Sequence, residues 1–145
     1  MKLLKKILIF VFILIAVKLL FFLPGNCKVT HKLIMIENEI EKRGYRNDWF
    51  IISGQRHLWY NKILANSAKD SYHLKGEAID IYVIDINGDG IFNSEDIKIF
   101  ESANKYVESI HPELIGAVGT YTTKGYLTRH MIHVDTRGYK LRYNK

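Results

Sequence analysis

The body of the chain carries histidines and aspartates whose types and spacing could bind a divalent metal ion. His73 and Asp80 occur in the stretch "SYHLKGEAID", on either side of Gly76, a residue that allows a sharp turn. His133 and Asp135 occur together in "MIHVD", near the C-terminus. Zinc takes about four ligands from His, Cys and carboxylate side chains, and a catalytic zinc leaves one position to water. Two imidazoles and a carboxylate would suit such a site, although single histidines more often only satisfy ordinary hydrogen bonds.

Two expected strands would position these residues. Residues 78–85, "AIDIYVID", form the clearest strand because they are rich in Ile and Val. Residues 130–138 are expected to form the last strand. Residues two apart on a strand share a face, so His133 and Asp135 would point one way and the apolar residues between and before them would face the core. Pairing of the two strands would bring together His73, Asp80 and His133.

The remaining pattern predicts an α+β domain with a small antiparallel sheet and flanking helices, because strands and helices mix without a regular βαβ alternation. Apolar spacing and turn residues mark the elements. Helices are expected at 31–44 and 94–110, a helix or loop at 56–70, and strands at 48–54, at 78–85, after a turn within 111–122, and at 130–138. With 145 residues, 48% of them hydrophobic and 25% charged, the chain has the composition of one globular domain, and we expect a monomer.

The N-terminus predicts export. "MKLLKK" precedes "ILIFVFILIAVKLLFFLPG", the basic and then apolar order of an export signal. The apolar stretch from Ile7 to Leu23 has about 17 residues, the lower limit for a membrane span. No Ala-x-Ala cleavage site follows. Residues 1–23 are therefore expected to form an uncleaved hydrophobic anchor helix, with its lysines on the cytoplasmic side of the membrane. A cleaved signal peptide is the alternative. Residues 24–30 would be a linker and 31–145 an exported domain at the cell envelope.

The net charge indicates which binding partners suit the chain, and the cysteine content limits disulfides and zinc ligands. The net charge of +6 and the pI near 9.3 suit an anionic polymer such as a cell wall. Nucleic acid is not expected, because no run of Lys and Arg is interleaved with aromatic residues. Cys27 is the only cysteine, which excludes an internal disulfide and a zinc site built from several thiolates.

Two stretches resemble a family of zinc peptidases. "SYHLKGEAID" matches Ser-x-His-x-x-Gly-x-Ala-x-Asp, and "MIHVDTRG" supplies a later strand histidine. Together they resemble the peptidases that group D-alanyl-D-alanine carboxypeptidases with lysostaphin-type enzymes and the Hedgehog signalling domain. The likeness is greatest to bacterial murein endopeptidases of the carboxypeptidase type. "IISGQRHLWYN" also looks like the Ser-Gly-x-Arg segment of that family, so the resemblance runs from about Ile51 to Gly138.

The resemblance implies a Hedgehog/D-Ala-D-Ala peptidase-like fold and zinc-dependent hydrolysis of peptide bonds in peptidoglycan stems or cross-links. It implies that the zinc ligands are His73, Asp80 and His133. Arg56 would hold a carboxylate or carbonyl group of the peptide through its fork of donors. From the sequence itself, an ion pair is an equally good role for this arginine.

The chain departs from the family at the general base. Many relatives carry a glutamate three residues before the last zinc histidine, where this chain has His130. An imidazole could accept the proton, provided that the strand starts after His130, since a regular strand would aim it away from His133. Asp135 is the other candidate base, and could equally orient His133 as a hydrogen-bond partner. The candidate catalytic residues are thus His130, Asp135 and Arg56.

A second ion site is expected at residues 85–96, "DINGDGIFNSED", within the peptidase-like domain. Oxygen-bearing side chains at alternate positions, with Gly90 at the sharp turn, resemble the calcium loops of dockerins and EF-hands. The expected calcium ligands are Asp85, Asn87, Asp89, the carbonyl of Ile91, and Asp96. An Asn-Gly/Asp-Gly turn without an ion is the alternative. Because only one such loop is present, a paired calcium sensor is not expected.

Three functions compete. The first is an anchored, exported zinc peptidase of cell-wall peptides that is stiffened by calcium. The second is a non-catalytic module that contains zinc and calcium and binds peptidoglycan, which the departure at His130 favours. The third is a structural calcium-binding surface protein whose histidines are accidental, against which the match over Ser71 to Asp80 argues.

Overall fold

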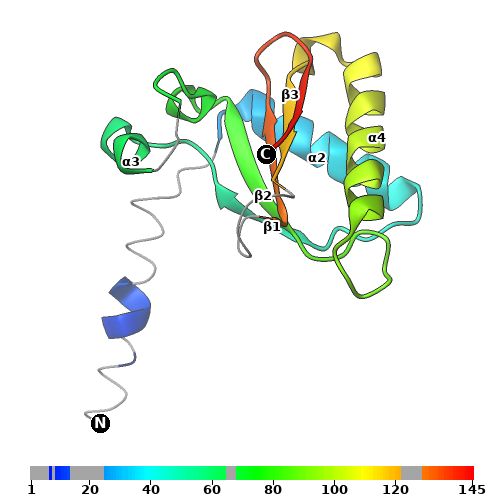
Figure 1. Ribbon diagram of the computed structural model, residues 1–145, viewed down its shortest axis with the longest axis horizontal. Coiled ribbons are helices and arrows are strands. Elements are labelled where there is room, and N and C mark those ends of the chain that lie inside the picture. Colours follow the sequence, from blue (N-terminus) through cyan, green and yellow to red (C-terminus); the bar gives the residue numbers. More distant parts are fainter. Residues whose placement is uncertain (1–6, 8, 14–24, 65–67, 122–128) are drawn as a thin grey trace.

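Two helices cover one face of a five-stranded sheet in the computed structural model, which describes residues 7, 9–13, 25–64, 68–121 and 129–145 (Figure 1). The helices are α2 (Cys27–Lys42), α3 (Leu58–Ile63) and α4 (Ser94–Ile110), with short 3-10 helices η1 (Tyr72–Lys75) and η2 (Pro112–Leu114). The strands are β1 (Trp49–Ser53), β2 (Ala78–Val83), β3 (Ala117–Thr120), β4 (Met131–Asp135) and β5 (Leu141–Asn144). The α+β prediction is confirmed.

The sheet has the order β1-β2-β4-β3-β5 and is mixed. Neighbouring strands are antiparallel except that β5 runs parallel to β3. The expected antiparallel sheet is therefore mixed, and the expectation that 130–138 forms the last strand was wrong. The missed strand, "LRYN", is short and largely exposed, so it lacks the apolar alternation by which a strand is recognised in a sequence.

Helix α2 begins earlier than the sequence suggested. The side chain of Asn26 accepts hydrogen bonds from the main-chain N–H groups of Lys28 and Val29, both at 3.1 Å, and so caps the helix. Residues 27–30, which were expected to belong to a linker, form its first turn. Its buried residues recur at helical spacing and face the sheet: Val29, Lys32, Leu33, Ile36 and Ile40.

The two faces of the sheet differ in chemistry. The apolar residues of the strands contact α2 and α4 and form the core, as expected for Ile132 and Val134. Phe100, Ala103 and Val107 contribute from α4, whereas Ile110 at its end is half exposed. The opposite face is not covered by these two helices, and it carries the alternate, polar residues of β2 and β4.

A buried ion pair joins the helices to the sheet. Lys32 Nζ lies 2.9 Å from Glu108 Oε1, and both side chains are fully buried. Lys32 also donates to the main-chain oxygen of Asp135 at 3.0 Å, and Arg142 of β5 donates to Glu108 Oε2 at 2.7 Å. Burial lowers the pKa of Lys32 below its ordinary value, although Glu108 acts in the opposite direction. The end of β4 is thus held in place by a charge network that removal of one partner would leave uncompensated.

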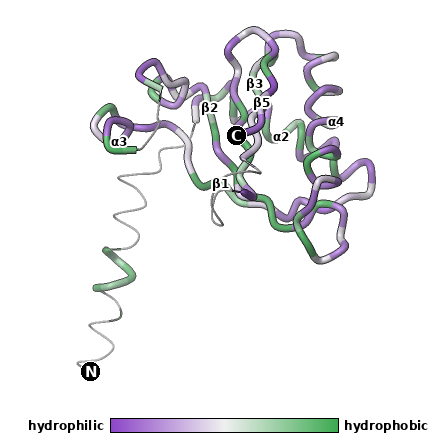
Figure 2. The backbone as a smooth tube through the Cα atoms, viewed as in Figure 1, coloured by the Kyte–Doolittle hydropathy of each residue, from purple (hydrophilic) through white to green (hydrophobic). Residues whose placement is uncertain are grey.

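The expected anchor lies mostly outside the described residues. Of residues 1–23, the structure describes 7 and 9–13, where 9–13 are helical and strongly hydrophobic (Figure 2). Among the helices of the described part, none has both the length and the apolar character that a bilayer crossing requires.

Candidate metal centre

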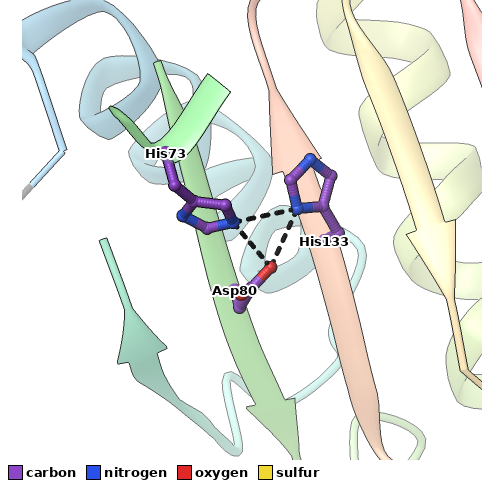
Figure 3. A group of neighbouring side chains, drawn as sticks. All are labelled: His73, Asp80 and His133. Carbon is purple, nitrogen blue, oxygen red and sulfur yellow. Dashed lines mark hydrogen bonds and ion pairs between the residues drawn. The ribbon is translucent and has the colours of Figure 1, made fainter. Parts of the chain in front are cut away.

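Three buried side chains direct one ligand atom each at a common point (Figure 3). His73 Nε2 lies 3.2 Å from Asp80 Oδ1 and 3.2 Å from His133 Nδ1, and the last two atoms are 2.8 Å apart. Ligands about 2.0–2.1 Å from a tetrahedral zinc would lie about 3.3 Å from one another. The group therefore could hold a metal ion, and within the described residues it is the group of His, Cys, Asp and Glu side chains that converges in this way.

Local turn chemistry brings His73 to the cluster. Ser71 caps the short helix η1 by accepting a hydrogen bond from the main-chain N–H of His73 at 3.3 Å. Gly76 ends the helix with a left-handed φ of 71°, which a residue with a side chain adopts only under strain. The turn predicted at Gly76 is confirmed, and it returns the chain so that His73 lies over the start of β2.

Strand register places the other two ligands. Asp80 of β2 pairs with His133 of β4, and the residues on either side of each face the core instead. The β1–β2 ladder is irregular between Ile51 and Ser53, so that Ser53 lies opposite Asp80. Such a bulge redirects side chains at a sheet edge and here supplies a hydroxyl beside the cluster.

The second nitrogen of each imidazole already has an acceptor. His73 Nδ1 lies 2.7 Å from the main-chain oxygen of Gly54, and His133 Nε2 lies 3.3 Å from Asp135 Oδ2. When both nitrogens donate, the inward nitrogens of neutral His73 and His133 carry lone pairs, not protons. These lone pairs meet the anionic oxygen of Asp80, so the arrangement needs a cation or an added proton at its centre.

The charges of the cluster favour the ionised form of each group, so they lower the pKa of Asp80 and raise that of His133. Burial pushes the pKa of Asp80 up, but the charges of His73 and His133 and their hydrogen bonds outweigh it and hold the pKa far below its usual range. Burial lowers the pKa of His133, but hydrogen bonds to Asp135 and Asp80 outweigh burial and raise the pKa above its ordinary value. His133 thus retains a proton readily, and a metal ion entering the cluster would displace that proton.

Arg56 lies beside the cluster and pairs with Asp80, one of the three candidate metal ligands. Its guanidinium pairs with Asp80 Oδ2, and its Nε donates to Ser53 Oγ at 2.8 Å. Its main-chain N–H donates to the oxygen of His73 at 2.9 Å. Arg56 therefore forms an ion pair that neutralises the outer oxygen of Asp80 and leaves Oδ1 for a metal.

Asp135 orients His133. Besides its contact with His133, Oδ2 accepts a hydrogen bond from Arg137 Nε at 2.8 Å, and Oδ1 accepts one from the main-chain N–H of Ala117 at 2.6 Å. Burial raises the pKa of Asp135, but the bonds from His133 and Arg137 outweigh it, and the net pKa is far below the usual range. A carboxylate with both oxygens engaged is a poor proton acceptor, so the orienting role is the one that this geometry supports.

His130 is not brought to the cluster. Its ring stacks on Tyr82, with centroids 5.1 Å apart, and on Phe92, with centroids 4.3 Å apart. Its Nδ1 lies 3.2 Å from the main-chain oxygen of Val83. The strand does start after His130, because β4 begins at Met131, but three residues of extended chain span about 10 Å and the ring stacks away from the cluster.

Two tyrosines beside the cluster were not predicted. The rings of Tyr143 and His133 have centroids 6.2 Å apart, and the hydroxyls of Tyr143 and Tyr121 lie 3.4 Å apart. Burial raises the pKa of Tyr143 far above its ordinary value, and the hydrogen bond to Tyr121 and the charges of Asp80 and Asp135 act in the same direction. Neither tyrosine lies in a recognisable motif, and Tyr143 belongs to the missed strand.

The loop 85–96 closes on itself through hydrogen bonds. Gly88 and Gly90 have positive φ, and the N–H of Gly90 donates to Asp85 Oδ2 at 3.0 Å. Asp96 accepts from the main-chain N–H groups of Ile86, Asn87 and Asn93 at 2.7, 3.1 and 2.7 Å. The oxygens expected to bind calcium at Asp96 are thus already engaged. Asn87 and Asp89 hydrogen-bond each other, and Ile91 is exposed.

Comparison with known proteins gives no relative for this chain. No family model matches it, and neither the curated proteins nor the solved structures yield a match.

The contact between Asp135 and His133 should strengthen metal binding at the cluster. Asp135→Asn should weaken Co²⁺ binding by about 10–100-fold, because an amide cannot accept from both Arg137 and His133 as the carboxylate does. Competition with a chelating dye measures the affinity, and circular dichroism checks the fold. Asp70→Asn, an exposed aspartate, is the matched control. Equal affinity in a folded Asp135→Asn protein would show that Asp135 does not orient the ligand.

Proposed function

We propose that the chain is a zinc-dependent peptidase that hydrolyses peptide bonds in the stems or cross-links of peptidoglycan at the cell envelope. The observation that carries the proposal is the convergence of three lone-pair atoms from His73, Asp80 and His133, each imidazole being fixed by a partner on its far nitrogen. The resemblance of "SYHLKGEAID" and "MIHVDTRG" to zinc peptidases of cell-wall peptides supplies the reaction and the substrate class.

The donor set fits zinc. Two imidazoles and one carboxylate are a common protein ligand set for catalytic zinc, and they leave a position for water or substrate. Zinc at such a site polarises the scissile carbonyl and lowers the pKa of water. The chain's own residues would do the rest: His73, Asp80 and His133 bind the ion, Arg56 neutralises the outer oxygen of Asp80, and Asp135 fixes the ring of His133.

One observation favours the second candidate, a non-catalytic zinc-containing module that binds peptidoglycan. Within the described residues, the three ligands contact no carboxylate other than Asp80 and Asp135, and each of these is engaged elsewhere. His130, the expected proton acceptor, lies along the strand beside Phe92. A module without a proton acceptor would bind the ion and the wall peptide but leave the peptide intact.

Export and membrane anchoring through residues 1–23 belong to the same proposal. A basic and then apolar N-terminus and a net charge of +6 suit a protein held near an anionic wall.

Digestion of purified muropeptides separates the two candidates. The zinc-loaded full chain, in detergent, should release D-alanine or split cross-linked dimers, detected by liquid chromatography with mass spectrometry. His73→Ala should reduce both zinc content and cleavage to background, because one of three ligands is lost. His111→Ala, a histidine paired with Glu113 at the end of α4, should change neither. Bound zinc without cleavage would favour the binding module, and absence of bound zinc would contradict both.

Calcium binding at the loop 85–96 is a separate proposal. Its support is the spacing of the oxygen-bearing residues, the two glycines with positive φ, and the contact of Gly90 with Asp85. For calcium to bind at Asp96, the carboxylate would have to exchange main-chain N–H partners for the ion.

Calorimetric titration of CaCl₂ into the calcium-free full chain tests this loop. We expect a dissociation constant of about 10⁻⁴–10⁻³ M, the range of extracellular calcium modules. Asp89→Asn should abolish the heat, because it removes a ligand charge from an exposed position without opening the core. Asp70→Asn should leave the heat unchanged. If Asp89→Asn binds calcium as the wild type does, or the wild type gives no heat, the loop is a turn that holds no ion.

A further inference from the structure

A line of paired residues crosses the whole sheet at the level of the cluster. Ser53 pairs with Asp80, Asp80 with His133, His133 with Gly119, and Gly119 with Tyr143. The line therefore includes two metal-ligand candidates and ends in a tyrosine on β5. Tyr143 occupies the side of the cluster opposite Ser53 and Arg56.

Gly119 makes room for the tyrosine. A Cβ atom on Gly119 would lie 2.1 Å from Tyr143 Cζ and 2.5 Å from its hydroxyl oxygen. The outer end of the ring therefore lies directly over the main chain of β3, next to His133. Directly opposite residues of neighbouring strands have Cβ atoms about 4.5–5.5 Å apart, so the hydroxyl is close to the His133 side chain.

The hydroxyl of Tyr143 has a second hydroxyl as its partner. The oxygens of Tyr143 and Tyr121 lie 3.4 Å apart, with the rings edge to face at 6.1 Å. Two hydroxyls bring two protons, and the bond between them uses one. The other proton is available to an acceptor at the cluster. Tyr121 is also close enough to Asp80 and Arg56 for both charges to act on its hydroxyl.

We propose that the Tyr143–Tyr121 pair donates a hydrogen bond from Tyr143 to the carbonyl oxygen of an acyl substrate held at the cluster. The inference rests on the proposed function, because it requires a metal ion and a substrate carbonyl at His73, Asp80 and His133. Tyr121 takes no part in the reaction itself; it orients the Tyr143 hydroxyl. A fixed donor aimed at an oxygen that gains negative charge stabilises the transition state, and loss of one such donor costs about 10²–10³ in kcat.

Packing alone does not explain why residue 143 is a tyrosine and not a phenylalanine. The ring of Tyr143 fills the space over Gly119 and lies beside His133, which phenylalanine would do equally well. Within the part of the chain that the structure describes, the hydroxyl adds only the bond to Tyr121. The conservative variant Tyr143→Phe therefore removes the proposed donor and keeps the ring.

Acetohydroxamate, a small carbonyl compound that binds metals, tests the donor through the visible spectrum of the Co²⁺-loaded full chain. Tyr143→Phe should bind Co²⁺ as the wild type does but bind acetohydroxamate about tenfold more weakly, the worth of one hydrogen bond. Gly119→Ala should give a similar loss, since its Cβ displaces the ring. Tyr106→Phe, an exposed tyrosine on α4, should match the wild type.

The outcomes separate this inference from the function on which it rests. Equal acetohydroxamate affinity in Tyr143→Phe and wild type would overturn the donor role while leaving the metal centre intact. Failure of the wild type to bind Co²⁺ would overturn the metal centre itself, and the inference with it. Weaker acetohydroxamate binding at unchanged Co²⁺ affinity supports the donor role. Should the chain cleave muropeptides, Tyr143→Phe should lower kcat more than it changes KM.

Discussion

Three lone-pair atoms face one another in a buried place, and the structure around them is arranged to keep them there. Such a group is unfavourable by itself, because buried acceptors and anions need a donor or a cation. A proton on the inward nitrogen of His133 relieves it in part, and the far nitrogen of each imidazole has its own acceptor, Gly54 for His73 and Asp135 for His133. Binding of a divalent ion satisfies all three atoms at once.

The sheet holds the three atoms together because its two faces differ: one face packs against the helices, and the other carries the ligands. The core face holds β2 and β4 rigidly against α2 and α4, so that alternate residues present Asp80 and His133 in fixed register. Support reaches further than the ligands. Lys32, buried with Glu108, donates to the main chain of Asp135, whose carboxylate fixes His133. A lysine of the first described long helix thereby helps to set the direction of a ligand in a strand more than a hundred residues later in the chain.

Much of the cluster could be predicted from the sequence, because its three members lie in local patterns. The turn at Gly76 and the alternation in β2 and β4 are short-range signals, and they place His73, Asp80 and His133 correctly. What could not be predicted depends on contacts between distant segments. The pairing of Arg56 with Asp80 depends on how β1 and β2 align, and Lys32 gives no sign of burial in the sequence because lysines are ordinarily exposed.

Strand β5 and its tyrosine were also missed because they depend on contacts between distant segments of the chain. β5 is short and mostly exposed, and its pairing parallel to β3 is a tertiary event. Its Tyr143 could be placed beside His133 only once Gly119 was seen to leave the space.

Zinc binding by His73, Asp80 and His133 can be seen directly in an anomalous difference map from crystals of the zinc-loaded protein, recorded on both sides of the zinc absorption edge. We expect one peak about 2.0–2.2 Å from His73 Nε2, Asp80 Oδ1 and His133 Nδ1, present above the edge and absent below it. Fully formed crystals with no peak among these three atoms, or with zinc bound only elsewhere, would contradict it.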